Sequence, residues 1–243
     1  MRSIKNLALL IMVLAHMMGC VQETKNLAII PADKLESNWW NERHHKVIAN
    51  NKTNPELILI GNSILNSLDD KAGIPIWEKY MDKHSVVNMG FSGDRTENVI
   101  WRLQNGEIDG INPKLALVLI GTNNTDGNHY LNITQPEELA EGIWEICRII
   151  REKLPKTQIL LLGIFPYGYK PNYRDKINKA TNNIISGFPE KDKNIHYRDI
   201  SPVFLDAELK VKKSLMPDYL HPNTDGYLLM FEALENDILE LMN

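Results

Sequence analysis

Cysteine is scarce in this sequence, which has only Cys20 and Cys147 among its 243 residues. Two cysteines cannot build the disulfide framework that stabilises many small secreted domains. An excess of basic residues is also missing, because 27 Lys and Arg face 31 Asp and Glu and the formal net charge is -4. Since nucleic-acid-binding proteins usually carry a basic surface, this composition argues against that class of protein.

Long apolar runs are equally scarce. The longest, within residues 7–18, is interrupted by His16 and is too short to span a bilayer as a helix. Neither an internal repeat nor an obvious linker divides the chain. With 43% hydrophobic and 24% charged residues, the composition is typical of a globular protein, and the length suits one sizeable α/β domain.

The apolar run at the N-terminus has the features of a secretory signal. Arg2 and Lys5 precede it, and Met-Met-Gly-Cys at residues 17–20 follows it. This tetrapeptide resembles the cleavage box of bacterial lipoproteins, whose cysteine becomes the lipidated first residue of the mature protein. A plain signal peptide with a chance cysteine and a buried N-terminal helix are the alternatives.

We therefore expect residues 1–19 to be a lipoprotein signal peptide and Cys20 to carry lipid. Residues 20–38 are mixed in polarity and weakly patterned, so we predict a tether there and a folded domain over residues 39–243. The expected location is the bacterial cell envelope, with membrane contact only through the lipid on Cys20. Cys147 then has no disulfide partner, and its place on an apolar helix face predicts a small core residue.

From residue 39 onward, short apolar runs alternate with longer amphipathic segments. The apolar runs suit strands that are covered on both faces, as in a parallel sheet. Strands and helices that alternate in this way predict right-handed crossovers and a three-layer α/β/α sandwich around a five-stranded parallel sheet. The predicted strands are 57–60, 85–89, 115–120, 158–164 and 194–198, and the predicted helices are 39–50, 74–82, 94–104, about 135–154, 173–185 and 226–241. A Thr-x-x-Glu capping box at residues 134–137 is expected to open the longest central helix.

The first three predicted strands end in loops that contain small polar residues. These loops are Gly61-Asn62-Ser63, Gly-Phe-Ser-Gly-Asp at residues 90–94, and Gly-Thr-Asn-Asn at residues 121–124. Because the carboxyl ends of parallel strands meet at one edge of the sheet, a serine, a glycine amide and an asparagine amide can converge there. A nucleophile and neutral hydrogen-bond donors are what acyl transfer requires. Taken alone, the first loop is more typical of an ordinary strand-to-helix turn with a capping serine.

A histidine and a carboxylate lie close together near the C-terminus, in Asp-Tyr-Leu-His at residues 218–221. Residues three apart in a turn can face the same way. Asp218 can then hold the proton on Nδ1 of His221 while Nε2 accepts the proton of a serine hydroxyl. Asp126 and His129 have the same spacing, but two ligands without a third do not predict a metal site.

Together these motifs resemble the SGNH hydrolase superfamily, which includes the GDSL esterases and lipases. The family's Gly-Asp-Ser block matches residues 61–63, its second-block glycine matches Gly93, its Gly-x-Asn block matches residues 121–123 and its Asp-x-x-His block matches residues 218–221. Residues 88–107 are most similar to acetylhydrolases related to the catalytic subunits of platelet-activating-factor acetylhydrolase.

The resemblance implies a flavodoxin-like fold and a role for each matched residue. Ser63 would be the nucleophile, His221 the general base and Asp218 the residue that orients it. The amides of Ser63 and Gly93 and the side chain of Asn123 would form the oxyanion hole. Such a mechanism needs neither a metal ion nor an organic cofactor.

Asn62 departs from the family pattern, which has aspartate before the nucleophile. Asparagine has nearly the same shape and keeps one acceptor oxygen, but it lacks the negative charge. Hydrogen bonds from backbone amides to this side chain would weaken without disappearing. We therefore expect slower or retuned catalysis, while a loss of activity is the alternative.

The expected substrate is a short-chain ester, with acetyl groups on carbohydrates as the first hypothesis. A lysophospholipase or thioesterase acting on membrane lipids is the runner-up. From a different class, the chain could be a non-catalytic glycan-binding lipoprotein that keeps the fold. Acyl esters of different length separate the first two hypotheses, and only the third predicts no turnover.

Overall fold

The structure is a computed structural model that describes residues 25–243. The predicted signal peptide, Cys20 and the first residues of the predicted tether lie outside this range. Within it, none of the helices is long and apolar enough to cross a membrane.

Five parallel strands form one sheet in the order β2-β1-β3-β4-β5. This order is the flavodoxin-like variant of the doubly wound fold, in which ligands bind beyond the carboxyl ends of the strands. The predicted fold class and all five predicted strands are confirmed, with ends that differ by one or two residues. The strands are β1 Leu57–Gly61, β2 Val86–Gly90, β3 Leu115–Leu119, β4 Gln158–Leu162 and β5 Ile195–Arg198.

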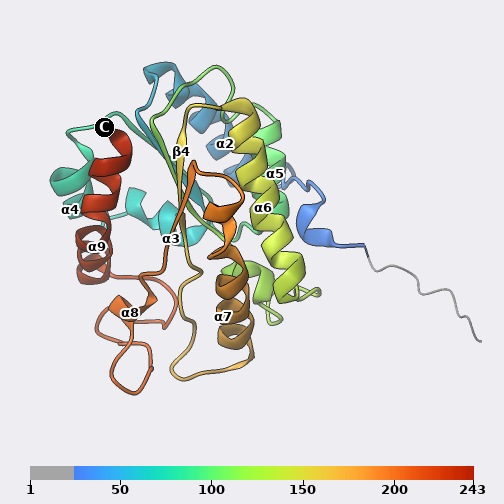
Figure 1. Cartoon of the computed structure of the whole chain (residues 1–243), viewed down its shortest axis with the longest axis vertical. Helices are drawn as coiled ribbons and strands as arrows, with labels where there is room; N and C mark the ends of the chain where they lie inside the picture. Colours follow the sequence, from blue (N-terminus) through green and yellow to red (C-terminus); the bar gives the residue numbers. More distant parts are fainter. Residues whose placement is uncertain (1–24) are drawn as a thin grey trace, which may run out of the picture.

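Helices cover both faces of the sheet (Figure 1). Successive strand residues point to opposite faces, so Ile58 and Ile60 of β1 pack in one apolar core and Leu57 and Leu59 in the other. Burial on both faces is the reason that these strands are continuously apolar. The first core is covered by α2 Asn38–Asn50, α5 Thr96–Gln104, α6 Pro136–Lys153 and α7 Tyr173–Ile185, and the second by α4 Ile74–Ile76, α8 Ser201–Phe204 and α9 Thr224–Met242.

Several local predictions need correction. The helix predicted over residues 74–82 is the short α4 followed by a π-helix, η4 Trp77–Met81. The capping box lies one residue later than predicted, because the side chain of Glu138, not Glu137, accepts from the N–H of Gln135 at 3.1 Å. Pro136 is the first helical residue, which makes Gln135 the cap. The four-residue α8 and the equally short α3, Ser63–Asn66, were not predicted because such helices are too short to show a periodicity.

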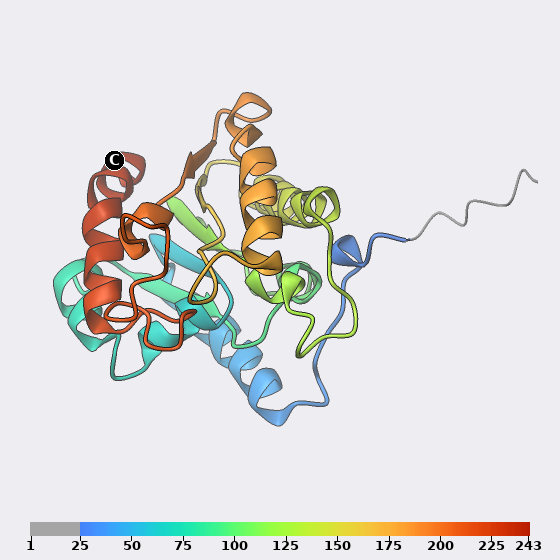
Figure 2. The same cartoon turned by 90° about the horizontal axis from the view of Figure 1, so that it is seen from below.

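Residues 25–37, which we call the N-terminal segment, are not a free tether. Its 3-10 helix η1, Leu27–Ile29, packs against α5 and α6, and Ala28 is fully buried. The carbonyl oxygen of Ala28 accepts from Thr96 Oγ1 at 2.9 Å, and that of Ala32 accepts from Asn98 Nδ2 at 2.9 Å. Figure 2 shows the segment in blue, running from η1 to α2. The described part of the predicted tether over 20–38 therefore packs on the domain, where side chains of α5 hold its backbone.

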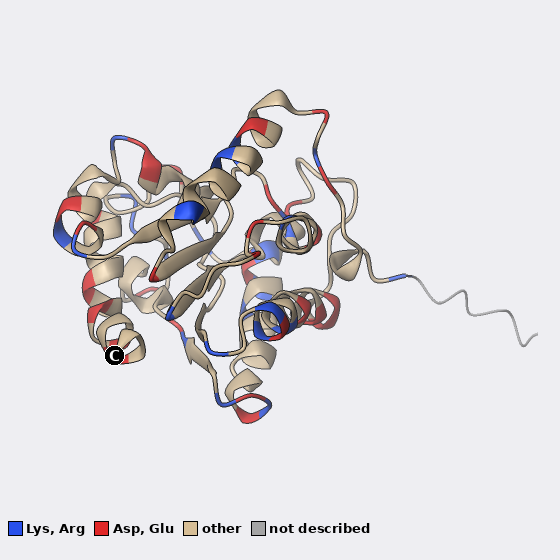
Figure 3. Cartoon of the chain, turned by 90° about the horizontal axis from the view of Figure 1, so that it is seen from above, with Lys and Arg blue, Asp and Glu red and all other residues tan. Residues whose placement is uncertain are grey.

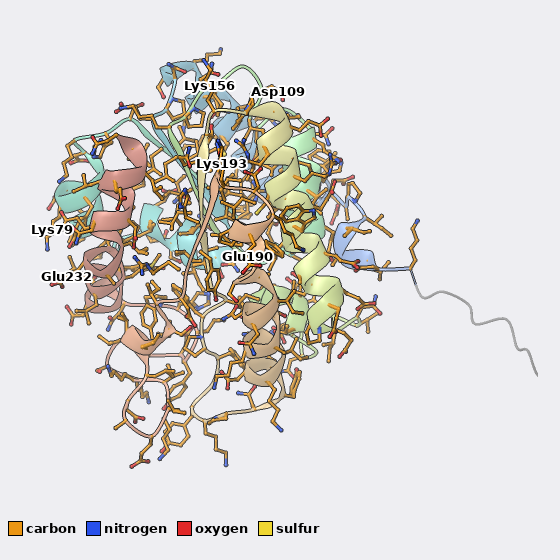
Figure 4. All side chains as sticks on the ribbon, viewed as in Figure 1. Lys79, Asp109, Lys156, Glu190, Lys193 and Glu232 are labelled. Atoms are coloured by element: carbon orange, nitrogen blue, oxygen red, sulfur yellow. The ribbon has the colours of Figure 1, made fainter. Side chains whose placement is uncertain are left out.

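Charged residues of both signs are interspersed on the helices and loops around the sheet (Figure 3). Side chains such as Lys79, Glu232, Asp109 and Lys156 point outward from the rim of the domain (Figure 4). Charged groups at the surface keep their hydration, so most of them need no partner. A few charged side chains are fully buried instead, and these lie next to the site described below.

Candidate active site

Ser63 lies at the carboxyl end of β1, as the first residue of α3. The chain turns at Gly61, where a Cβ atom would lie only 2.2 Å from the carbonyl oxygen of Leu119. Asn62 caps the helix, because its Oδ1 accepts from the N–H of Ile64 at 3.0 Å, and its side chain is almost fully buried. A cap needs a single acceptor oxygen, which asparagine supplies as well as aspartate does. The substitution at residue 62 therefore leaves the turn that carries Ser63 intact.

The loop before α9 brings a histidine and a carboxylate to Ser63. His221 Nε2 lies 2.8 Å from Ser63 Oγ, and His221 Nδ1 lies 2.6 Å from Asp218 Oδ2. The other oxygen of Asp218 accepts from the backbone N–H groups of Leu220 and His221 at 3.0 and 2.8 Å. An ionised carboxylate can only accept, so Nδ1 carries the ring proton and Nε2 is free to accept from the serine hydroxyl. Residues 158 positions apart in the sequence are thus within hydrogen-bonding distance.

The pKa of the Asp218 carboxyl is set by two opposing influences. Partial burial raises it, but hydrogen bonds from the His221 ring and from backbone amides outweigh the burial, and the net pKa lies below its ordinary value. Asp218 is therefore charged at neutral pH. A charged Asp218 is the form that holds the His221 ring in place and stabilises a protonated imidazole.

Gly93 and Asn123 lie on the loops after β2 and β3, the two strands that flank β1. Gly93 has φ +77°, a backbone conformation that favours glycine, and among residues 25–243 no acceptor is recorded for its N–H. Asn123 Nδ2 donates to the carbonyl oxygen of Asp94 at 2.8 Å, which joins the two loops. The second N–H of the Asn123 amide group is left for another acceptor.

A buried group of charged residues supports the β2 loop, and the sequence analysis did not identify it. Arg102 of α5 donates from Nε to Asp94 Oδ2 at 2.8 Å and forms an ion pair with Glu107, and none of the three side chains is exposed. Trp40 Nε1 donates to the other oxygen of Asp94 at 2.9 Å, and His44 Nδ1 contacts Glu107 at 2.9 Å. In the sequence, the sign of this buried group is that Arg102 falls on the apolar face of the amphipathic helix predicted over residues 94–104.

The remaining candidates have other partners. Asp126 Oδ2 contacts His129 Nδ1 at 2.7 Å and lies 3.4 Å from Arg174, a buried cation that would compete with a metal ion. Cys147 is fully buried within the core covered by α6, as predicted. Burial raises the pKa of its thiol to about 12, so it is not a thiolate nucleophile.

A serine, an imidazole and a carboxylate within hydrogen-bonding distance, at the carboxyl edge of a parallel sheet, are the parts that define Ser-His-Asp hydrolases. The chain belongs to the GDSL-like lipase/acylhydrolase family, whose model matches residues 59–229. This membership supports an ester-hydrolysing enzyme over a non-catalytic binding protein.

A relative agrees with this assignment, and two solved structures share the fold. The chain is 30% identical over 204 residues to the human platelet-activating factor acetylhydrolase IB subunit alpha1, and the match covers 84% of each protein. A GDSL-like lipase from Bacteroides thetaiotaomicron is similar in fold, with a TM-score of 0.62, 18% identity and coverage of 82% of this chain and 96% of that one. An acetylxylan esterase from Geobacillus stearothermophilus has a TM-score of 0.60, 16% identity and coverage of 78% and 94%.

Proposed function

We propose that this protein is a serine esterase that removes short acyl groups, acetyl in particular, from carbohydrate esters through a covalent acyl-enzyme. The hydrogen-bonded series from Ser63 through His221 to Asp218 is the observation that carries the proposal. In the first step, Ser63 Oγ attacks the ester carbonyl while its proton passes to His221 Nε2. His221 then gives this proton to the leaving alcohol oxygen.

The negative charge that develops on the carbonyl oxygen needs donors that are already in place. We assign this role to the backbone N–H groups of Ser63 and Gly93 and to the side chain of Asn123. In the second step, His221 takes a proton from water, whose oxygen attacks the acyl-enzyme. The ester bond to Ser63 Oγ then breaks, acetate leaves, and His221 returns the proton to Ser63 Oγ. Asp218 stays charged throughout and stabilises the imidazolium form of His221.

The choice of acetyl rests on the relatives. The human protein at 30% identity is named an acetylhydrolase, and the structural neighbour from Geobacillus stearothermophilus, which shares the fold alone, is named an acetylxylan esterase. These two names differ in the alcohol part of the ester and agree on the acyl group. The acyl group is therefore better supported than the alcohol.

Two tyrosines beside His221 favour a carbohydrate as the alcohol. Tyr219 lies between Asp218 and His221, and its ring meets that of Tyr169 edge to face with centroids 5.6 Å apart. The loop that carries Tyr169 is joined to Tyr219 by a hydrogen bond from Gly168 N to the Tyr219 carbonyl oxygen at 3.0 Å. Tyr169 is 56% exposed, and Lys210 Nζ lies over its ring at 5.8 Å from the centroid. The exposed part of the ring is available to stack on the apolar face of a sugar.

A set of substrates tests the proposal directly. Wild-type protein is given p-nitrophenyl acetate, p-nitrophenyl octanoate, an acetylated xylo-oligosaccharide and a phospholipid that carries an acetyl ester. We expect p-nitrophenyl acetate to be cleaved much faster than p-nitrophenyl octanoate. We also expect a higher kcat/KM for the acetylated xylo-oligosaccharide than for the phospholipid. Preference for octanoate would contradict the acetyl assignment.

A phospholipid acetyl ester is the second candidate substrate, and the names of the relatives at 30% identity favour it. It predicts a higher kcat/KM for the phospholipid acetyl ester than for the acetylated xylo-oligosaccharide. In both cases p-nitrophenyl acetate should be cleaved faster than p-nitrophenyl octanoate. The chemistry at Ser63 is identical in both cases.

Replacing Tyr169 by alanine is expected to raise KM for the acetylated oligosaccharide about fivefold, because loss of a stacked ring costs on the order of 1 kcal/mol. KM for p-nitrophenyl acetate, which has no sugar, should stay within about twofold. Tyr169→Phe is the matched control, because it keeps the ring. Steady-state kinetics of the three proteins on both substrates make the comparison, and an equal rise in KM for both esters would contradict the assignment of the subsite.

We also propose that the protein is a lipoprotein of the bacterial cell envelope, anchored through Cys20. Expression of the full chain and of Cys20→Ser in a bacterium that processes lipoproteins should place only the unchanged chain in the membrane fraction. Only that chain should incorporate labelled palmitate. Equal labelling of the two proteins would remove the basis for the anchor.

A further inference from the structure

Two side chains from distant parts of the sequence hold the carbonyl oxygen of Gly93. Lys34 Nζ donates to it at 2.8 Å, and Tyr130 Oη donates to it at 2.5 Å. Lys34 belongs to the N-terminal segment, and Tyr130 follows the Asn123 loop. Burial raises the pKa of Tyr130, so this side chain stays a neutral phenol that can donate.

Gly93 needs such support because of its backbone. A glycine at φ +77° has more conformational freedom than any other residue, and its N–H is the proposed donor to the oxyanion. The neighbouring Asp94 is fixed at its carboxylate by Trp40 and Arg102 and at its carbonyl oxygen by Asn123. Among the described residues, the side chains that hold Gly93 itself are Lys34 and Tyr130, both through its carbonyl oxygen. The carbonyl and the N–H of Gly93 belong to the two peptide groups that meet at its Cα atom. Holding the carbonyl anchors one of these groups, so the N–H can change direction only through rotation about φ and ψ of Gly93.

The N-terminal segment is built in a way that presents Lys34 to this loop. Its start is tied to α6, because Asn26 Nδ2 donates to the Glu138 carbonyl oxygen at 3.0 Å. Its middle is tied to α5, where Ala32 N donates to the Glu97 carbonyl oxygen at 3.1 Å. The side chain of Lys34 is only 25% exposed, and Nζ also lies 3.4 Å from Asp94 Oδ1. The ammonium group therefore has two acceptors on the loop after β2.

We propose that Lys34 and Tyr130 are positioning residues that aim the N–H of Gly93 at the oxyanion. The N-terminal segment is then a working part of the esterase domain and not only its connection to an anchor. This inference rests on the proposed function, because it concerns the oxyanion hole of the proposed reaction.

The test compares full-length wild type, Lys34→Met, Lys34→Arg and Tyr130→Phe on p-nitrophenyl acetate. Lys34→Met should lower kcat by about tenfold to a hundredfold, because a donor displaced by about 1 Å loses much of its effect on the transition state. KM should stay within about twofold, since the ester binds before the oxyanion forms. Lys34→Arg keeps a charged donor and should recover most of kcat, and Tyr130→Phe should behave like Lys34→Met.

Asn26→Ala is the matched control, because it removes side-chain contacts at the start of the segment, while the hydrogen bonds at Ala28 and Ala32 still hold the part that carries Lys34. It should leave kcat within about twofold of wild type. Equal losses of kcat in Asn26→Ala and Lys34→Met would overturn the positioning role, and so would an unchanged kcat in Lys34→Met. If Ser63→Ala abolishes turnover in the same assay, the proposed function stands whatever Lys34→Met shows. If Ser63→Ala stays fully active, the proposed function itself fails.

Discussion

Ser63→Ala is expected to lower kcat for p-nitrophenyl acetate by about a thousandfold or more, because no other group can form the acyl-enzyme. The serine hydroxyl lies 2.8 Å from His221 Nε2 at the end of β1. Steady-state rates of purified wild type and variant measure the effect, and near-ultraviolet circular dichroism checks that the variant folds. Ser186→Ala, which removes a hydroxyl at the end of α7, should keep wild-type activity.

The same experiment extends to the histidine. His221→Ala should cost about as much as Ser63→Ala, and the double variant should lose little more than either single variant, because the residues act as one unit. Effects that multiply in the double variant would show that Ser63 and His221 act independently. Full activity in Ser63→Ala would rule the mechanism out.

Arg102→Met is expected to lower the free energy of unfolding by about 3–5 kcal/mol, because it removes the buried cation that two buried carboxylates share. The guanidinium group of Arg102 pairs with Asp94 and Glu107, and it lies over the Phe91 ring at 3.9 Å from its centroid. Without it, Asp94 and Glu107, which have no exposure to water, lose their shared cation and keep only their contacts with Trp40, Lys34 and His44. Urea unfolding followed by tryptophan fluorescence measures the loss.

An exposed arginine provides the control. Arg148 of α6 forms ion pairs with Glu145 and Glu152, and its side chain is 49% exposed. Water screens these pairs, so Arg148→Met should change the free energy of unfolding by less than about 1 kcal/mol. Similar losses for Arg148→Met and Arg102→Met would contradict the role given to burial. A fall in activity beyond the loss of stability is expected for Arg102→Met alone, because Asp94 adjoins Gly93.

The position of Ser63 and the contact between Asp218 and His221 could be predicted, because the first depends on a general rule of parallel sheets and the second on local sequence. A strand that ends in Gly61 must place Ser63 at the carboxyl edge, and the Asp-x-x-His spacing puts Asp218 and His221 in one turn. The exact helix ends were less predictable, as the capping residue Gln135 shows, because one residue of offset changes little in an apolar periodicity.

By itself, the sequence determined the order of strands and helices, the two apolar faces of the sheet and the loops that carry Ser63, Gly93, Asn123 and His221. These features follow from periodicity and from residues that are close together in the chain. Only the tertiary structure decided that the N-terminal segment lies on α5 and α6, and that Lys34, Tyr130 and Arg102 gather behind the loop of Gly93. Contacts between polar side chains far apart in sequence leave no periodic pattern, because their free energy comes from burial and pairing that exist only once the sheet has brought the loops together.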